Sequence, residues 1–351
     1  MRRAETPLCL ASFVSCVAIA FFACGRPTES ARGGARAPID VRIAIGGQNQ
    51  LIYLPTTLAG ELGFYKEEGL NVELQDLAGG SKALQALVGG SADVVSGFYD
   101  HTIQMAAEGR ELTAFVAMLR FPGLVLVTSP QSAAAVTKIE DLKGKVVGVT
   151  TAGSSSQMLL TYLLQRHGVS AASVRITAIG SSATAIAALE RGTVDAGMVA
   201  DPAFTLVSRR NPGVRVLADL RRAEGVKASF GSATYPASVL YSNAEWIRTN
   251  RDTAARLARA ITKTLIWMQS HPPQEIADKT PPAFRGEDQA IYVEALASSM
   301  PMFSPDGLMD LDGAESVKRL MAMSMEKVQN ATIYLGKTYT NEFVPHKSVN
   351  P

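Results

Sequence analysis

The chain has 351 residues, which corresponds to roughly two domains of ~150 residues each. Hydrophobic residues make up 47% of it and charged residues 19%, a composition typical of globular rather than disordered proteins. The formal net charge is +2 and aromatic residues make up 7%. This balance argues against a nucleic-acid-binding protein, which needs a basic face and rings for base stacking.

The cysteines and histidines exclude several kinds of site. The three cysteines all lie within the first 24 residues, at Cys9, Cys16 and Cys24. The rest of the chain therefore offers no disulfide framework, thiolate metal site, iron–sulfur cluster or cysteine nucleophile. The four histidines are His101, His167, His271 and His346, and no two have metal-ligand spacing. We expect neither a metal nor a cofactor.

The N-terminus reads as an export signal over residues 1–24. Arg2 and Arg3 precede 16 uncharged apolar or small residues, Leu8–Ala23, whereas a membrane span needs ~20. The segment around Cys24 resembles a bacterial lipoprotein box, in which the cysteine becomes lipidated, although Phe21 stands where leucine is usual. Ordinary cleavage and a buried apolar helix are the alternatives. Residues 25–38 carry small and polar residues and predict a flexible tether, so we expect an exported, cell-envelope protein anchored by lipid.

Strands and helices alternate after the tether. The predicted strands of the first half are Val41–Ile45, Val72–Leu74, Val94–Ser96 and Leu112–Met118, and the helices between them are Leu54–Leu62, 81–88 and 101–107. Strands alternating with helices of about ten residues predict an α/β fold with mostly parallel sheets.

An internal repeat predicts two similar lobes. Residues 86–93 read ALVGGSAD and residues 188–195 read ALERGTVD, and flanking segments match in the same order. The repeated unit is a strand, a small-residue turn, a helix that ends at glycine, and an aspartate before the next strand.

Two β-rich stretches, 123–129 and 236–242, lie outside the repeated units and predict crossings between the lobes. From residue 244 onward the pattern is helical, with helices expected at 244–269, 286–299 and 313–330. We expect these helices to pack on the first lobe and its flank.

Four motifs carry a resemblance to a known family: residues 54–74 (LPTTLAGELGFYKEEGLNVEL), 86–97 (ALVGGSADVVSG), 139–149 (IEDLKGKVVGV) and 195–204 (DAGMVADPAF). The chain resembles the periplasmic substrate-binding proteins of nitrate-, sulfonate- and taurine-type ABC importers over residues 41–243. The resemblance implies a two-lobed clamshell of the type II class, with two crossover strands and C-terminal helices. It also implies lobe 1 at 39–128 and 236–351, lobe 2 at 129–235, a monomer, and a permease with its ATPase subunits as partners.

Candidate ligand-binding residues follow from the rule that ligands bind beyond the carboxyl ends of strands in α/β sheets. Helix starts and hydroxyl groups at these ends favour an anion. This rule selects Gln48, Asn49, Gly80, Ser81, Thr151, Ser154, Ser155 and Ser156. Ordinary helix capping is the alternative reading of the serines and glycines.

Aromatic and charged residues complete the predicted site. Phe98, Tyr99 and Asp100 follow a strand, and Arg120 follows another, where its guanidinium could grip a sulfonate or carboxylate. Asp201 occupies the Asp-Pro element of the family, with Ala200 where the family usually has an aromatic residue. Tyr235 lies at the second crossover. We expect an anionic ligand end at the serines and a donor group at Asp201; the alternative is that Asp201 only caps a helix.

Three functions compete at this stage. The first is a transport receptor that captures a small organic anion or related molecule, of sulfonate, nitrate, carboxylate or pyrimidine type. The second is an enzyme of the same fold that acts on a pyrimidine or menaquinone precursor. The missing cysteines disfavour the pyrimidine chemistry and the leader disfavours the cytoplasmic menaquinone enzymes, so we expect no catalysis. The third is a sensor subunit, which the sequence leaves open.

Overall fold

The computed structural model describes residues 37–77 and 79–345. The chain divides into two units, Met1–Arg36 and Ala37–Pro351, and the described residues all belong to the second. The predicted leader, the lipidation site Cys24 and all but the last two residues of the predicted tether lie outside the described residues.

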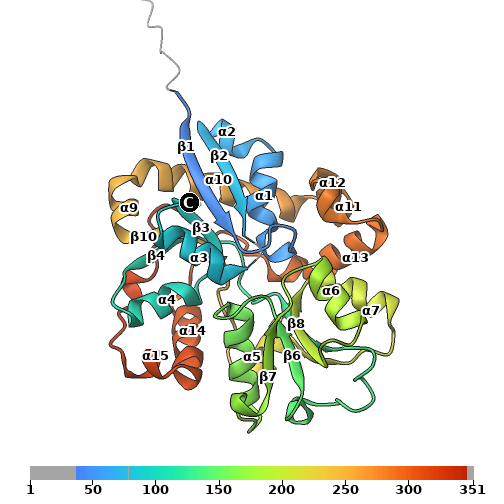
Figure 1. The fold of residues 1–351 in the computed structure, drawn as a ribbon. Coiled ribbons are helices and arrows are strands. Elements are labelled where there is room, and N and C mark those ends of the chain that lie inside the picture. Colours follow the sequence, from blue (N-terminus) through green and yellow to red (C-terminus); the bar gives the residue numbers. More distant parts are fainter. Residues whose placement is uncertain (1–36, 78, 346–351) are drawn as a thin grey trace, which may run out of the picture. The chain divides into compact units, whose positions relative to one another are not determined.

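The first sheet has five strands in the order β2-β1-β3-β10-β4 (Figure 1). Strand β1 pairs in parallel with β2 and β3, and β10 runs antiparallel between β3 and β4. Four strands therefore share one direction and the returning strand β10 opposes them. The bounds are β1 Ile39–Ile45, β2 Leu70–Asp76, β3 Val94–Phe98, β4 Leu112–Ala117 and β10 Ser238–Asn243.

The second sheet repeats this plan in the order β7-β6-β8-β5-β9. Here β5 is the strand that opposes the other four. The bounds are β5 Leu124–Thr128, β6 Val146–Val149, β7 Arg175–Ala178, β8 Ala196–Ala200 and β9 Val216–Asp219. The expected lobe border at residue 128 is wrong, because β5 pairs only with strands of the second sheet. The chain crosses between the sheets just before Leu124 and returns before Ser238.

The internal repeat has a physical counterpart in the two sheets. Asp93 precedes β3 and accepts a hydrogen bond from the backbone N–H of Arg42 on β1 at 2.9 Å. Asp195 precedes β8 and accepts one from Val146 on β6 at 2.8 Å. Each aspartate thus ties the start of its own strand to the backbone of the adjacent parallel strand, which explains why both repeats carry it.

Helices flank both sheets. Those of the two repeats are α1 Leu54–Glu61, α2 Phe64–Glu67, α3 Gly80–Val88, α4 Asp100–Ala107, α5 Ser155–Arg166, α6 Ala183–Glu190, α7 Ala203–Arg210 and α8 Ala223–Phe230. The C-terminal helices are α9 Ala244–Thr249, α10 Arg251–Ser270, α11 Pro273–Lys279, α12 Pro282–Arg285, α13 Gln289–Ser299, α14 Leu311–Ser324 and α15 Glu326–Asn330.

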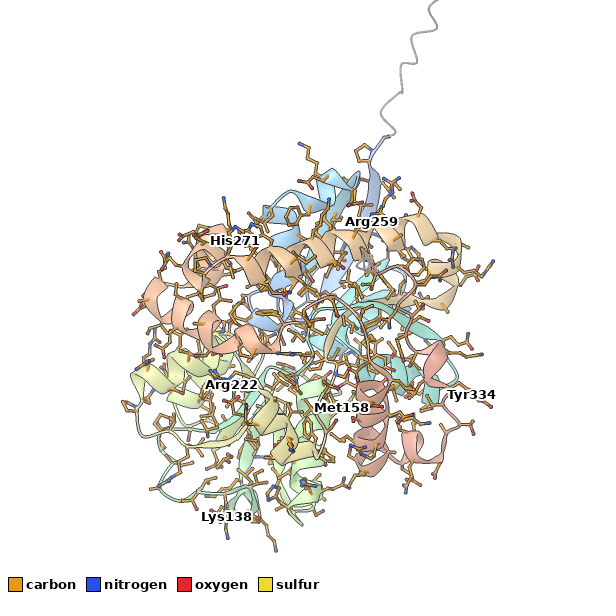
Figure 2. All side chains as sticks on the ribbon, turned by 180° about the vertical axis from the view of Figure 1, so that it is seen from behind. Lys138, Met158, Arg222, Arg259, His271 and Tyr334 are labelled. Carbon is orange, nitrogen blue, oxygen red and sulfur yellow. The ribbon has the colours of Figure 1, made fainter. Side chains whose placement is uncertain are left out.

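The C-terminal helices contact both halves of the molecule, not the first lobe and its flank alone. Helix α10 packs on α1, α2 and β4, whereas α13 packs on α7, and α14 packs on both α4 and α5. Seen from behind, α10 carries Arg259, which pairs with Glu68 at 2.8 Å (Figure 2). The helix expected at 244–269 breaks at Asn250, whose backbone leaves the helical region, and the one expected at 313–330 breaks at Met325.

A search of the described residues for a helix long and apolar enough to cross a membrane finds none.

Candidate functional site

A small cavity lies where the carboxyl ends of strands from both sheets meet. Its volume is about 20 Å³, which is close to the space that one water molecule needs. An organic ligand therefore requires the two lobes to move apart. Larger hollows, of about 700 and 840 Å³, are open surface depressions beside α15 and α9. The cavity is lined by Gly46, Gln50, Ile52, Tyr53, Gly80, Phe98, Leu124, Thr150, Ser154, Ser155 and Ser156.

One wall of the cavity is a cluster of hydroxyl groups at the start of α5. Thr150 and Ser156 are 2.9 Å apart, and Ser154 lies 2.9 Å from Thr150 and 2.8 Å from Ser156, measured between side-chain oxygens. The first N–H groups of a helix have no partner within the helix and form the positive end of its dipole. This wall can therefore receive an electronegative or anionic part of a ligand.

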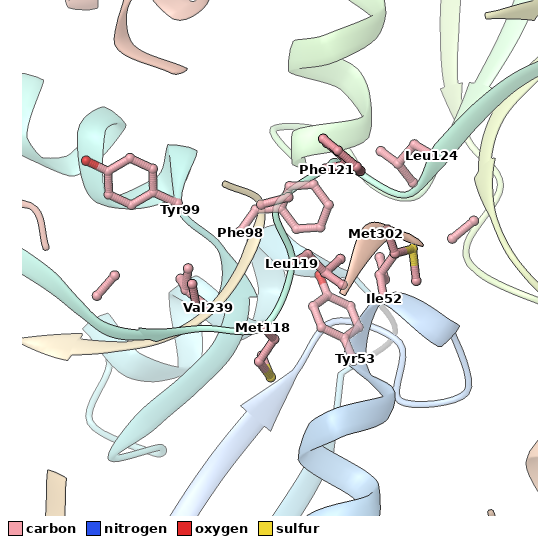
Figure 3. Close-up of a cluster of buried hydrophobic side chains, with 14 of the residues drawn as sticks. Ile52, Tyr53, Phe98, Tyr99, Met118, Leu119, Phe121, Leu124, Val239 and Met302 are labelled. Carbon is pink, nitrogen blue, oxygen red and sulfur yellow. The ribbon is translucent and has the colours of Figure 1, made fainter. Parts of the chain in front are cut away.

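The opposite wall is apolar and comes from the first lobe and the crossover. Tyr53 meets Phe98 edge to face, with ring centroids 6.4 Å apart. Figure 3 shows these two rings with Ile52, Leu124 and Met302 gathered near them. Such a wall favours a ligand with an apolar or flat aromatic part.

Asp100 is a carboxylate buried beside the cavity. It begins α4, just after β3, and is 1% exposed. Its Oδ1 accepts a hydrogen bond from the Ser155 hydroxyl of the other lobe at 2.7 Å, whereas Oδ2 has no partner among the described residues. Burial raises the pKa of Asp100, which is opposed by the His101 ring, the Ser155 hydrogen bond and the backbone N–H of His101.

The ring of His101 is buried next to Asp100. Its Nδ1 lies 3.2 Å from the hydroxyl of Tyr241. Burial lowers the pKa of His101, and the neighbouring Asp100 only partly opposes that effect. The ring is therefore expected to be neutral at pH 7.

Eight of the predicted ligand-binding residues lie in or next to the cavity. Gly80, Phe98, Ser154, Ser155 and Ser156 line the cavity. Asp100, Ser81 and Thr151 adjoin it and join the lobes, since the hydroxyls of Ser81 and Thr151 are 2.9 Å apart.

Four predicted residues do not line the cavity because their side chains bind elsewhere. The Tyr99 hydroxyl lies 2.6 Å from Thr338 Oγ1, so its ring turns away from Phe98 (Figure 3). Arg120 is exposed and donates to the carbonyl of Pro301 at 3.0 Å. Gln48 donates a hydrogen bond to Thr57 Oγ1 at 3.3 Å. The ring of Tyr235 packs on that of Phe230, with ring centroids 5.1 Å apart. Asn49 also lies outside the lining, although its buried Oδ1 has no partner among the described residues.

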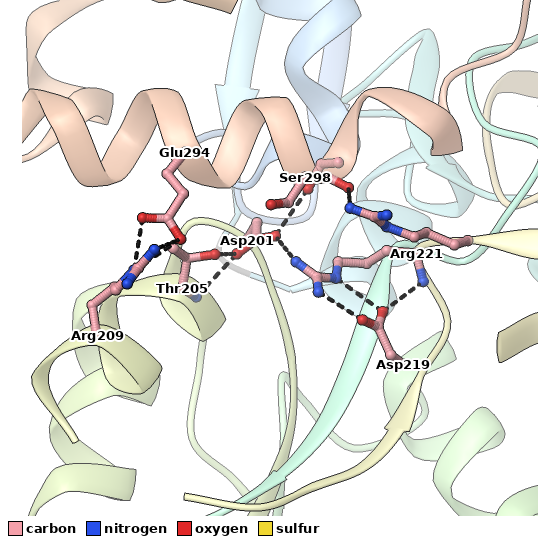
Figure 4. Close-up of polar contacts among 9 residues, drawn as sticks. Asp201, Thr205, Arg209, Asp219, Arg221, Glu294 and Ser298 are labelled. Carbon is pink, nitrogen blue, oxygen red and sulfur yellow. Dashed lines mark hydrogen bonds and ion pairs between the residues drawn. The ribbon is translucent and has the colours of Figure 1, made fainter. Parts of the chain in front are cut away.

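Asp201 is placed differently from its prediction, because both oxygens of its carboxylate already accept hydrogen bonds from other residues of the chain (Figure 4). Oδ1 accepts hydrogen bonds from the N–H and the hydroxyl of Thr205, at 3.0 and 2.6 Å. Oδ2 accepts from Arg221 Nη1 at 2.8 Å and from the hydroxyl of Ser299 at 2.9 Å. The carboxylate therefore caps α7 and anchors a buried arginine. Both oxygens thus already have donors within the chain, which favours the helix-cap alternative over the expected contact with a ligand donor.

Sequence reasoning missed six lining residues. Gly46 ends β1, and an added Cβ there would come within 2.5 Å of the backbone nitrogen of Gly80. The strand-end rule could have selected it, and likewise Thr150, which follows β6. Nothing in the sequence separates the others from ordinary core residues, because their role depends on the crossover and on the turn before α1. The six are Gly46, Gln50, Ile52, Tyr53, Leu124 and Thr150.

Within residues 37–77 and 79–345, no group of three or more histidine, cysteine, aspartate or glutamate side chains could hold a metal ion.

Several known proteins similar to this chain are named as binding proteins. A solved structure of a Bordetella bronchiseptica protein is 36% identical, covers 88% of this chain and 96% of its own, and has a TM-score of 0.84. The alkanesulfonate-binding protein SsuA of Xanthomonas axonopodis, solved with MOPS, shares the fold at 17% identity, 86% and 98% coverage, and a TM-score of 0.67. YtlA of Bacillus subtilis, which is named as a binding protein, is 24% identical over 79% of this chain and 81% of its own.

One relative is an enzyme by name. The pyrimidine phosphate synthase of Schizosaccharomyces pombe, which makes 4-amino-5-hydroxymethyl-2-methylpyrimidine phosphate, is 27% identical over 146 residues. This match covers 42% of the present chain and 40% of that protein.

The family model described as "NMT1/THI5 like" matches residues 52–275, which include most of both sheets and nearly every residue that lines the cavity. The two-sheet architecture, the opposed strands β5 and β10, and the fold shared with SsuA agree with that match. The chain belongs to the NMT1/THI5-like family and has the periplasmic-binding-protein fold.

Proposed function

We propose that this chain is the solute-binding receptor of an ABC importer. It captures a small organic anion or related small molecule, of sulfonate, nitrate, carboxylate or pyrimidine type, between its lobes and delivers it to the membrane permease. The observation that carries the proposal is the cavity, because it lies at the carboxyl ends of strands in both sheets and takes its lining from both lobes. The printed names of SsuA and YtlA support a binding role.

Hinged closure is the mechanism we propose. We assign lobe 1 to the first sheet and lobe 2 to the second, with the hinge in the crossings before Leu124 and Ser238, where a few residues absorb the rotation. Hydrogen bonds join the two lobes, from the Ser155 hydroxyl to Asp100 and from the Leu51 N–H to the Asp201 carbonyl at 2.8 Å. A ligand must enter while these bonds are open and is enclosed when they re-form.

Ligand binding tests the proposal. A thermal-shift screen of small sulfonates, carboxylates, nitrate and pyrimidines should identify compounds that raise the melting temperature, because a ligand that binds only the folded chain stabilises it. Small-angle scattering should show a smaller radius of gyration with such a compound than without it. A tight ligand that leaves the radius unchanged would rule out closure, and a screen with no stabilising compound would count against the receptor.

Anchoring needs its own test, because Cys24 lies outside the described residues. We propose that Cys24 is lipidated and that residues 25–38 tether a monomeric receptor in the cell envelope. Cys24→Ser should release the protein from washed membranes. A wild-type protein that is already free after export, with its mature N-terminus beyond Cys24, would contradict the anchor.

Catalysis is the second candidate, favoured by the partial match to the pyrimidine phosphate synthase. Against it, the Ser155 hydroxyl donates to Asp100 and not to a histidine, so the cavity shows no serine–histidine pair among the described residues. A receptor should return its ligand unchanged after long incubation. Mass spectrometry that finds a converted compound would establish an enzyme instead.

A further inference from the structure

Each lobe carries a buried aspartate just after a corresponding strand of the repeat, and the two aspartates differ in the hydrogen bonds that they accept. Asp100 follows β3 and Asp201 follows β8, which are corresponding strands of the internal repeat, and each side chain is 1% exposed. Both oxygens of Asp201 accept two hydrogen bonds each, whereas Oδ2 of Asp100 has no partner among the described residues. A buried carboxylate is strongly unfavourable unless it is paired and hydrogen-bonded. Asp100 therefore lacks a donor that the fold supplies to Asp201.

The described part of the chain provides no cation for that place. The groups that face Asp100 are the His101 ring, the Ser155 hydroxyl and the tyrosines Tyr53, Tyr235 and Tyr241. Burial lowers the pKa of His101, which keeps the ring neutral. Burial also raises the pKa of each tyrosine, so all three stay protonated. No ion pair among residues 37–77 and 79–345 includes Asp100.

The carboxylate is close to the proposed ligand. Its Oδ1 is held by Ser155, which lines the cavity and belongs to the opposite lobe. Phe98, two residues before Asp100 in the chain, forms the apolar wall with Tyr53. Asp100 is not itself among the residues that line the cavity, so a ligand would meet this unpartnered acceptor when it enters between the open lobes, with the hydroxyl cluster of Thr150 and Ser154 on the other side.

We infer that Asp100 receives an N–H donor of the ligand, and that the ligand is a small organic molecule with a protonated amine, an amidinium or an N–H heterocycle. The inference rests on the proposed receptor function and narrows its ligand class. Closure of the lobes buries Asp100, and a donor-bearing ligand compensates that charge, whereas a simple anion adds repulsion. Asp100 is thereby a specificity-determining residue, and the hydroxyl cluster takes the acceptor or anionic end.

The first test needs no ligand and compares Asp100→Asn with Asp201→Asn. Because burial raises the pKa of Asp100, its ionisation destabilises the folded chain increasingly as pH rises above the ordinary value of 3.8. Asp100→Asn should therefore raise the melting temperature at pH 8, by less at pH 5, while Asp201→Asn lowers it at both. Loss of stability in Asp100→Asn at pH 8 would mean that the carboxylate already has its partners, and would overturn the inference.

The second test uses probe pairs that differ only in the donor: taurine with isethionate, aminomethylbenzoate with hydroxymethylbenzoate, and benzylamine with benzyl alcohol. At least one amine should stabilise the wild type more than its hydroxyl partner, and Asp100→Asn should weaken that amine at least tenfold in calorimetric titration, as expected for a hydrogen bond to a charged group. If only the hydroxyl or anionic probes bind, the assignment of Asp100 fails while the receptor stands. If no probe of either kind binds and the wider screen of the proposed function also fails, the receptor and the assignment fall together.

Discussion

The buried pair of Asp201 and Arg221 offers the sharpest test of how the second lobe is built. The side chain of Arg221 is 9% exposed, and it holds Asp201 at 2.8 Å and Asp219 at 2.6 Å. In Asp201→Asn the remaining Oδ1 can still accept from Thr205, and the Ser299 hydroxyl can turn to accept from the new amide. Arg221 cannot turn in this way, because a guanidinium only donates.

The expected cost is one charge-assisted hydrogen bond. Such bonds contribute about 1.5–3 kcal/mol, and because Asp219 continues to neutralise Arg221 we expect a loss of about 2 kcal/mol in the free energy of unfolding. One kcal/mol shifts the melting temperature by about 2–4 °C in chains of about 150–250 residues, so a fall of about 4 °C is expected for this longer chain.

Chemical and thermal unfolding followed by circular dichroism would measure this loss. Thr205→Val is the matched comparison, because it removes a hydroxyl donor to the same carboxylate, leaves the ion pair with Arg221 in place, and should cost about 1.5–3 kcal/mol. A double-mutant cycle of Asp201→Asn with Arg221→Met isolates the pair and should give a coupling of about 1 kcal/mol or more. Wild-type stability in Asp201→Asn, together with a loss of ligand affinity, would refute the structural role and restore a ligand-binding one.

Three further predictions concern the cavity and the repeat. Thr151→Val removes a 2.9 Å hydrogen bond between the lobes and should increase the ligand-free radius of gyration in small-angle scattering; an unchanged radius would show that this bond does not hold the lobes closed. Gly46→Ala places a methyl group 2.5 Å from the backbone nitrogen of Gly80 and should cost about 1–3 kcal/mol, read from the urea midpoint, unless the two loops separate freely. The hydrogen bond from Arg42 lowers the pKa of Asp93, so this carboxylate stabilises the fold above pH 3.8 and loses that effect as pH falls further. In Asp93→Asn the free energy of unfolding should therefore fall less steeply on the acid side of its pH dependence. An unchanged slope there would contradict this prediction.

Local pattern was sufficient for most of the secondary structure and for the family. Apolar runs bounded by glycine placed β1, β3 and α3 within a few residues of their observed ends, because glycine ends a helix or strand through its own backbone freedom. The repeated aspartates were visible because the same motif recurs in both halves, although the strands that they bind lie 51 and 49 residues earlier in the chain. The helix start at Ser154–Ser156 followed from the strand-end rule and lines the cavity as expected.

What the sequence could not decide depends on contacts between distant segments. Strand β5 looked like an extension of the first lobe, and only its pairing with β8 and β9 assigns it to the second sheet. Asp100 and Asp201 each come soon after a corresponding strand of the repeat and look alike as candidate ligand residues. Arg221 and Ser299, which lie 20 and 98 residues from Asp201, saturate its Oδ2, whereas no residue in the described part of the chain donates to Oδ2 of Asp100. The role of a buried carboxylate depends on which hydrogen-bond donors the tertiary structure brings to it, and the spacing of residues along the chain does not predict those donors.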